Sequence, residues 1–338
     1  MSVIEKVPTT VAPERRRLMG SAYDLSGATT ANEARSLADL DWEAVHRPLY
    51  VDLPPKGDET VGDLTLVTKE RAVVRTDTGE MFGVVGKEHK ILSNRDLFDF
   101  ADTLLDQADL TWANANPFGG ARSNGAAPFL AFQLGEGIQV AGVDAVDVAI
   151  LLNNGHVGNT AFTLTVTPIR LKCSNVVRAA ITSGRKGHAL YHQSIQHSGD
   201  LDTKVGAARA ALELTTVYMR EFADLANRMA ETEFGIAEFG DFITSLVPIS
   251  EDAGARAKAT AEERRSSFRR NWKDTLTLDL DLRNTAWGAL NVVTEVIDHG
   301  SLDVRKSSAP VPERRLNSVH FGSGARLRDR AFHLLAGV

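Results

Sequence analysis

The stretch from Asn153 to Asn175 places the strongest constraint on the fold, because it joins a polar turn to a long alternating strand. The turn runs to Asn159 and contains two glycines. From Phe162 to Cys173 apolar residues then alternate with polar ones, the period-two pattern of a strand with one buried face. Pro168 interrupts this run and indicates an open strand edge or a bulge.

The polar side of this predicted strand carries positive charge. Arg170 and Lys172 alternate there with apolar residues, and Ser174 or Asn175 is a suitable N-cap for a short helix over residues 176–181. Two cations beside a helix N-terminus favour binding of an anion. We therefore predict an anion-binding surface at this point of the chain.

Charge is unevenly distributed along the chain, whose formal net charge is −6. Between His156 and Asp200 there is one acid, Asp200, against five cations: Arg170, Lys172, Arg178, Arg185 and Lys186. The segment 253–273 holds seven cations and two acids. Such segments present a local positive field even in an acidic protein. The alternative for 253–273 is an ordinary solvated helix face.

Length and composition set the class of protein. The 338 residues suffice for one large domain or two, with a core that needs no disulfide or metal. The single cysteine, Cys173, excludes an intramolecular disulfide and fits a reducing compartment. We expect a cytoplasmic protein, since the sequence shows no apolar signal segment and no run of about 18 apolar residues.

The order of predicted elements indicates an α+β fold with a hairpin–helix–sheet–helix core and a mostly helical C-terminal half. We expect a flexible arm over 1–35, an α+β core domain over 36–200 and a helical region over 201–338. Strands are predicted for a hairpin over 73–85 and for 128–134, 138–140, 146–152 and 162–173. Helices are predicted for 39–45, 94–105, 203–232, 255–272, 285–298 and 325–335, and a glycine- and asparagine-rich turn for 112–124.

Several short motifs together resemble the "phage/plasmid-like" family of uncharacterised phage and plasmid proteins. They are Asp41-Trp42, the hairpin from Arg75 to Val85, Asn153 to His156, Thr167 to Asn175, His197 to Gly199 and Gly322 to Ala325. The resemblance covers roughly residues 40–335, and Thr167 to Asn175 is its most specific part. This family brings no established catalytic residues. The element order is also similar to the core of single-strand annealing recombination proteins, which act as rings or filaments.

The sequence contains three other candidate functional sites. His188, His192 and His197 are close in sequence, as zinc ligands often are, but no cysteine pair or HExxH motif accompanies them. Cys173 lies on the apolar side of its strand, which favours a buried structural thiol over a nucleophile. Gly322-Ser323-Gly324 before Arg326, Arg328 and Arg330 resembles a weak phosphate cradle. No nucleotide-binding loop or hydrolase motif is present.

The sequence therefore predicts a single-stranded DNA-binding and strand-annealing recombination protein of phage or plasmid type, with no catalytic residue, metal or cofactor. The predicted nucleic-acid contacts are Arg170, Lys172, Arg178, Arg185, Lys186, His156 and Asn175. We also expect a homo-oligomer, because an open strand edge pairs readily with another chain and because the 203–232 helix has a broad apolar face. The alternatives are a hydrolase of nucleotides or nucleic acid that uses His156 with the His188–His197 cluster, with or without a metal, and a structural protein of a mobile element.

Overall fold

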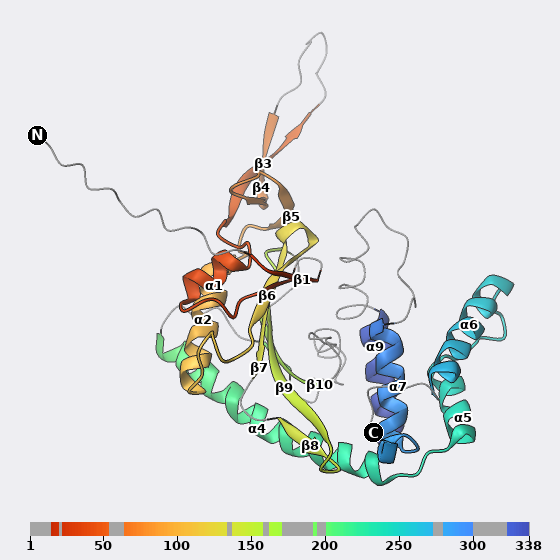
Figure 1. Cartoon of the computed structure of the whole chain (residues 1–338). Coiled ribbons are helices and arrows are strands. Elements are labelled where there is room, and N and C mark those ends of the chain that lie inside the picture. The colour runs from red at the N-terminus through yellow and green to blue at the C-terminus, as the bar shows by residue number, and fades with distance from the viewer. Residues whose placement is uncertain are drawn as a thin grey trace, which may run out of the picture.

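The computed structural model describes residues 15–19, 22–53, 64–133, 137–157, 162–170, 192–194, 201–272, 280–299 and 323–337. It confirms an α+β fold, with antiparallel sheets in the N-terminal half and helices in the C-terminal half. Figure 1 shows a hairpin arm projecting from the top of the molecule in this view, and the helices α5 and α6 at its right edge.

The large sheet is antiparallel and forms the centre of the molecule. Its strand order is β1-β2-β6-β7-β9-β10-β11, and β8 pairs with β9 next to the end of β7. Its strands are β1 (Arg17–Met19), β2 (Ala22–Asp24), β6 (Phe118–Arg122), β7 (Ala127–Gln133), β8 (Ile138–Val140), β9 (Asp144–Asn153), β10 (Thr163–Arg170) and β11 (His192–Ser194). Nearly the whole of β9 is buried, as expected for the central strand of a covered sheet.

The second sheet is small and forms the arm. It consists of β3 (Ala44–Asp52), β4 (Leu64–Arg75) and β5 (Met81–Gly86), in that order. β5 pairs only with residues 70–74 of β4, so the outer half of the arm is a two-stranded ribbon of β3 and β4. The hairpin predicted for residues 73–85 is present as the β4–β5 pair.

Helices cover the large sheet and continue past it. They are α1 (Ala31–Leu37), α2 (Asn94–Gln107), α4 (Leu201–Glu231), α5 (Ile236–Leu246), α6 (Ala255–Asn271), α7 (Ala286–His299) and α9 (Ser323–Ala336). α2 packs against α1 and α4, and α4 also contacts β8, β10, α7 and α9 (Figure 1). α6 contacts α5 and α7. In the described part of the chain no helix is both long and apolar enough to span a lipid bilayer.

Two buried hydrogen bonds attach the C-terminal helices to the sheet. The indole Nε1 of Trp287 in α7 donates to Asp144 Oδ2 at the start of β9 (2.9 Å). The backbone N–H of Ala141 donates to Asn227 Oδ1 in α4 (2.7 Å). One continuous hydrophobic cluster includes residues of both halves, from Tyr23 to Ala331. The helical half therefore shares a core with the sheet.

Capping residues explain where two of the helices begin. The Ser93 hydroxyl accepts from the Asp96 N–H, and the Asp96 carboxylate accepts from the Ser93 N–H, which makes a complete capping box at the start of α2. Thr30 caps α1 in the same way through the Glu33 N–H. The first of these starts was predicted from sequence.

Four expectations differ from the structure. The predicted arm over 1–35 ends earlier, because β1, β2 and α1 already belong to the folded body from Arg17 onward. Residues 39–43 form a turn rather than a helix, with Asp39 at φ 62° and the Trp42 indole donating to its carbonyl. The predicted turn 112–124 contains strand β6. Helix α5 was not predicted.

Candidate nucleic-acid interface

The predicted anion-binding strand is present as β10, and its cationic end lies at the end of the sheet. Arg170 is the last residue of β10 and pairs with Val146 of β9. The remaining predicted contacts of this segment, Lys172, Asn175, Arg178, Arg185 and Lys186, lie outside the described residues, as do Cys173 and the helix expected over 176–181. The structure therefore places Arg170 alone among them.

Pro168 lies where β10 has a described neighbour on one side only. It pairs with Val148 of β9, whereas β11 pairs only with Thr163 to Thr165. Among the described residues, no strand pairs with β10 at Pro168 on the side where β11 pairs with Thr163 to Thr165. This agrees with the open edge that the proline indicates.

His156 lies in the core instead of on the surface. It is 0% exposed, and its Nε2 lies 3.1 Å from Asn94 Oδ1. Its ring stacks on Phe82 (centroids 5.8 Å apart, 8° between planes) and meets Trp42 edge-on at 5.5 Å. The imidazole is thus enclosed by two aromatic rings and a buried amide.

This environment keeps His156 uncharged at neutral pH. Burial is the main cause that lowers the pKa of His156 to about 4; the charge of nearby His89 acts in the same direction, and a hydrogen bond with the Leu92 backbone acts against both. Because Asn94 Nδ2 donates to the carbonyls of Leu40 and Trp42, its Oδ1 is free to accept from His156 Nε2–H. A buried neutral ring cannot hold a phosphate, so we remove His156 from the predicted nucleic-acid contacts.

The neighbouring asparagines have structural roles of the same kind. Asn153 Oδ1 accepts from Arg122 (2.9 Å), a buried guanidinium whose pKa burial lowers to about 10. Asn154 Nδ2 donates to the Leu92 carbonyl just before α2 (3.1 Å). The Asn153–His156 turn therefore joins β9, α2 and the arm, and it provides a junction in the core in place of an anion site.

A basic surface is described elsewhere, on α6. The helix carries two acids, Glu262 and Glu263, against six cations: Arg256, Lys258, Arg264, Arg265, Arg269 and Arg270. Phe268 is its only buried residue, and residues 255–260 are all exposed. Figure 1 shows α6 beside α5 at the edge of the molecule. An exposed helix with this excess of cations presents positive potential on several sides.

Two of these arginines fasten the helix to α5. Arg265 Nε donates to the Val247 carbonyl (3.0 Å) and its NH2 to the Thr244 carbonyl (3.3 Å), while NH1 pairs with Glu262 at 2.7 Å. Arg269 NH2 lies 3.4 Å from Thr244 Oγ1. These contacts satisfy the carbonyls at the C-terminus of α5 and set the angle between the helices. Arg265 is therefore structural.

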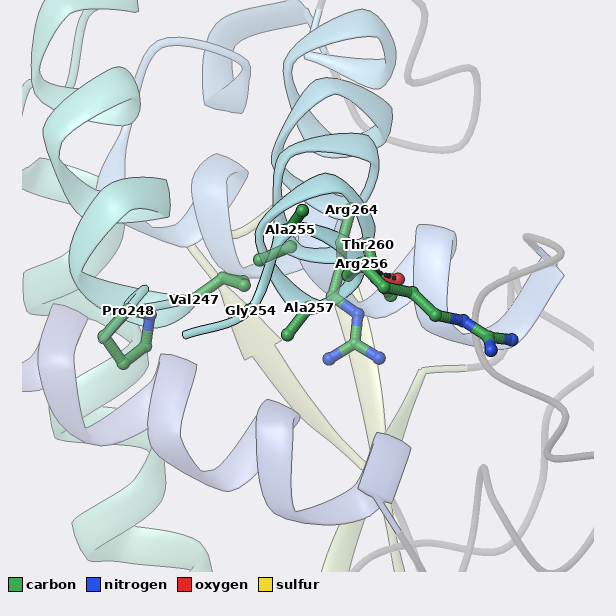
Figure 2. A pocket seen from close by; sticks show the side chains of 9 residues that line it. Val247, Pro248, Gly254, Ala255, Arg256, Ala257, Thr260 and Arg264 are labelled. Atoms are coloured by element: carbon green, nitrogen blue, oxygen red, sulfur yellow. Dashed lines mark hydrogen bonds between the residues drawn. The ribbon is translucent and has the colours of Figure 1, made fainter. Parts of the chain in front are cut away.

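The first half of α6 borders an open hollow of about 730 Å³, which we call the α6 hollow. It is lined by Val247, Pro248, Gly254, Ala255, Arg256, Ala257, Thr260, Ala261 and Arg264. In Figure 2 the Arg264 side chain passes close to Ala257, whereas Arg256 extends outward from the helix. The basic segment 253–273 is recognisable in the sequence, whereas no sequence motif indicates the hollow.

The other candidate sites gain no support from the described residues. In that part of the chain no group of three or more potential metal ligands comes together, and of the three clustered histidines only His192 is described, in β11. At the predicted phosphate cradle α9 begins at Ser323, but Arg328 is buried and Arg330 donates to the Ser245 carbonyl (3.0 Å). Two of the three arginines expected there thus take part in packing.

Comparison with known proteins gives one match. A family described as "Domain of unknown function (DUF932)" matches residues 81–321, which include both β10 and α6. No curated protein and no solved structure matches the chain.

Proposed function

The chain belongs to the DUF932 family, and we propose that it binds single-stranded DNA without sequence preference and anneals complementary strands, as a protein of phage or plasmid type. The observation that carries the proposal is the exposed helix α6, whose six cations and two acids oppose the net charge of −6 of the whole chain. Arg170 and the cations that follow it supply the second contact. Annealing itself is supported by the resemblance in element order.

A cationic helix of this kind suits a flexible single strand. Sequence-neutral binding needs positive groups along the phosphate backbone, and long exposed side chains adapt to its variable spacing. Arg256, Lys258 and Arg270 are exposed on α6 and make no hydrogen bond to α5 itself, although Lys258 Nζ donates to the Glu251 carbonyl in the preceding segment. We infer that these three side chains bind phosphates.

Binding of single-stranded DNA at several salt concentrations tests the proposal. The variant Arg256→Gln/Lys258→Gln/Arg270→Gln removes three positive charges from α6. The slope of log K against log salt should fall by about 2, since each phosphate contact on a single strand contributes about 0.7. Affinity for a 30-mer of thymidine should fall at least about tenfold at low salt, since each charged contact is worth roughly 1 kcal/mol.

The matched control removes the same charge from another surface. Lys87, Lys90 and Arg95 are exposed beside the arm and on α2. The variant Lys87→Gln/Lys90→Gln/Arg95→Gln should bind the 30-mer as wild type does. Equal loss in both triple variants would show that only net charge matters and would refute α6 as the interface. Arg170→Ala/Lys172→Ala should weaken binding to every sequence alike.

Self-association into an oligomer larger than a dimer is the second part of the proposal, and the exposed apolar surface of the arm supports it. Seven of the eleven large apolar side chains exposed in the described residues lie on or beside this small sheet: Tyr50, Val51, Leu53, Leu64, Leu66, Met81 and Val84. Among the described residues, no strand pairs with the second backbone edge of residues 64–68 of β4. Such an edge is a template for pairing with a second copy.

Light scattering at micromolar protein, with and without an oligonucleotide, measures this assembly. Leu66→Lys should lower the molar mass, because Leu66 is 45% exposed on the arm and a charge there opposes burial. Val143→Lys is the matched control, since Val143 is 46% exposed in the turn between β8 and β9. A wild type that stays monomeric in both conditions would contradict the oligomer and weigh against annealing.

A further inference from the structure

The α6 hollow has the composition of a ligand site. Its volume of about 730 Å³ lies within the 300–1,000 Å³ typical of small-molecule pockets. Valine, proline, alanine and glycine form most of its lining, and the polar groups are Thr260, Arg256 and Arg264. None of the described lining residues is acidic. An apolar wall with two guanidinium groups favours an anion that also has an apolar part.

The room in the hollow comes from small side chains at helical spacing. Ala257, Ala261 and Arg264 are separated by four and three residues, so they lie on one face of α6. Two alanines leave space on this face that larger residues would fill, and Arg264 closes it at one end (Figure 2). The hollow therefore exists without any rearrangement of the helix.

The opposite wall is held in place by hydrogen bonds. Arg265 fixes the Val247 carbonyl at 3.0 Å, and Lys258 Nζ donates to the Glu251 carbonyl at 3.0 Å. These bonds secure the start and the middle of the segment between α5 and α6, and Val247 and Pro248 at its start are part of the wall. A preformed wall lowers the entropic cost of ordering the site when a ligand binds.

The two guanidinium groups differ in their surroundings. Arg256 is exposed, whereas Arg264 is half-buried, and burial lowers the pKa of Arg264. Arginine remains protonated at neutral pH, and its planar fork suits a phosphate, which it binds through two parallel hydrogen bonds. Figure 2 shows the two groups apart, so each can contribute charge-assisted bonds to a different one of two consecutive phosphates.

We propose that the α6 hollow binds one nucleotide of the single strand, with its phosphate on Arg264, the next phosphate of the strand on Arg256, and the base against Val247 and Pro248. This inference rests on the proposed function. The open shape lets the strand continue on both sides. Because no aromatic ring is among the described lining residues, the base packs on aliphatic surface, which gives weak binding and little preference among bases.

Titration with thymidine 5′-monophosphate, thymidine and inorganic phosphate tests the inference separately from strand binding. The monophosphate should bind wild type at least tenfold more tightly than either fragment. Ala257→Phe, which fills the hollow without changing charge, and Arg264→Met should each weaken monophosphate binding at least tenfold and binding of the thymidine 30-mer about threefold. Ala259→Phe is the matched control: Ala259 is exposed on the same helix but does not line the hollow.

The outcomes distinguish the nucleotide site in the hollow from the proposed binding of single-stranded DNA. If the 30-mer binds wild type and Ala257→Phe equally well, and the monophosphate does not bind, the hollow is not a nucleotide site while the proposed function stands. If the monophosphate binds with the expected losses but the 30-mer does not bind at all, strand binding is refuted and the hollow is a site for a free nucleotide. Equal effects of Ala257→Phe and Ala259→Phe would refute the role of the hollow.

Discussion

His156 makes the stability of this protein depend on pH in a way that one substitution should remove. The ring is fully buried between Phe82 and Trp42 and bonded to Asn94, and its pKa is lowered to about 4 from 6.5. In the unfolded chain the same ring returns to its ordinary pKa of 6.5. Between these two values the unfolded state binds the proton and the folded state does not.

The sign and the size follow from this difference. Because the unfolded state binds more protons, the free energy of unfolding falls as the pH decreases from 6.5 toward 4. Each pH unit inside this window costs about 1.4 kcal/mol, so the loss is about 2 kcal/mol at pH 5 and about 3 kcal/mol at pH 4. Above pH 6.5 the contribution of the neutral ring is fully present.

Urea unfolding followed by tryptophan fluorescence at pH 8, 7, 6 and 5 measures the effect. His156→Gln keeps an N–H donor near Asn94 but has no proton to gain in this range. Its loss of aromatic packing should make it about 2 kcal/mol less stable than wild type at pH 8. This difference should shrink by about 2 kcal/mol by pH 5, since only wild type loses stability through this group.

Other groups titrate in the same range, which is why the difference between the two proteins is the quantity of interest. Contributions from carboxylates far from His156 are common to both and cancel. A gap between wild type and His156→Gln that is the same at pH 8 and pH 5 would show that the ring is not held neutral in the core.

Three further substitutions test the packing of the helical half by urea unfolding. A Cβ on Gly288 in α7 would lie 2.3 Å from the Leu282 carbonyl oxygen, so Gly288→Ala should lower the free energy of unfolding by about 2 kcal/mol or more. A Cβ on Gly240 in α5 would meet nothing within 4 Å, so Gly240→Ala should raise it by up to about 1 kcal/mol. If the two glycine variants have equal stability, the close approach at Gly288 is wrong. Trp287→Phe removes the indole donor to buried Asp144 and should cost about 1.5–3 kcal/mol, and an unchanged midpoint would contradict that bond.

Elements with strong local signals were predictable from the sequence. Ser93 and Asp96 indicate the start of α2. Two apolar runs around a glycine turn indicate the hairpin of β4 and β5. The sequence of α5 also contains a helical pattern, because Phe239, Phe242, Ile243 and Leu246 repeat at helical spacing and are all buried. Periodicity alone would have located this helix.

Elements that depend on tertiary contacts were not predictable in the same way. β6 is rich in glycine because a Cβ on Gly119 would lie 2.9 Å from the Phe129 carbonyl oxygen in β7, but glycines in a sequence more often indicate a turn. His156 follows two asparagines and a glycine, which suggests an exposed turn, and only the packing of Trp42 and Phe82 from other elements encloses it. The α6 hollow likewise needs two helices and the segment between them.

The place of β2 in the sheet has a consequence for how the chain folds during synthesis. β2 pairs with β6, so Ala22–Asp24 must wait for a partner that follows about 95 residues later. At 5–20 residues per second the ribosome takes about 5–20 s to make that partner. The arm and α2 lie between the two strands and consist of local contacts, which form much sooner than this. The first strands of the protein are therefore secured later than the arm and α2, although these follow them in the sequence.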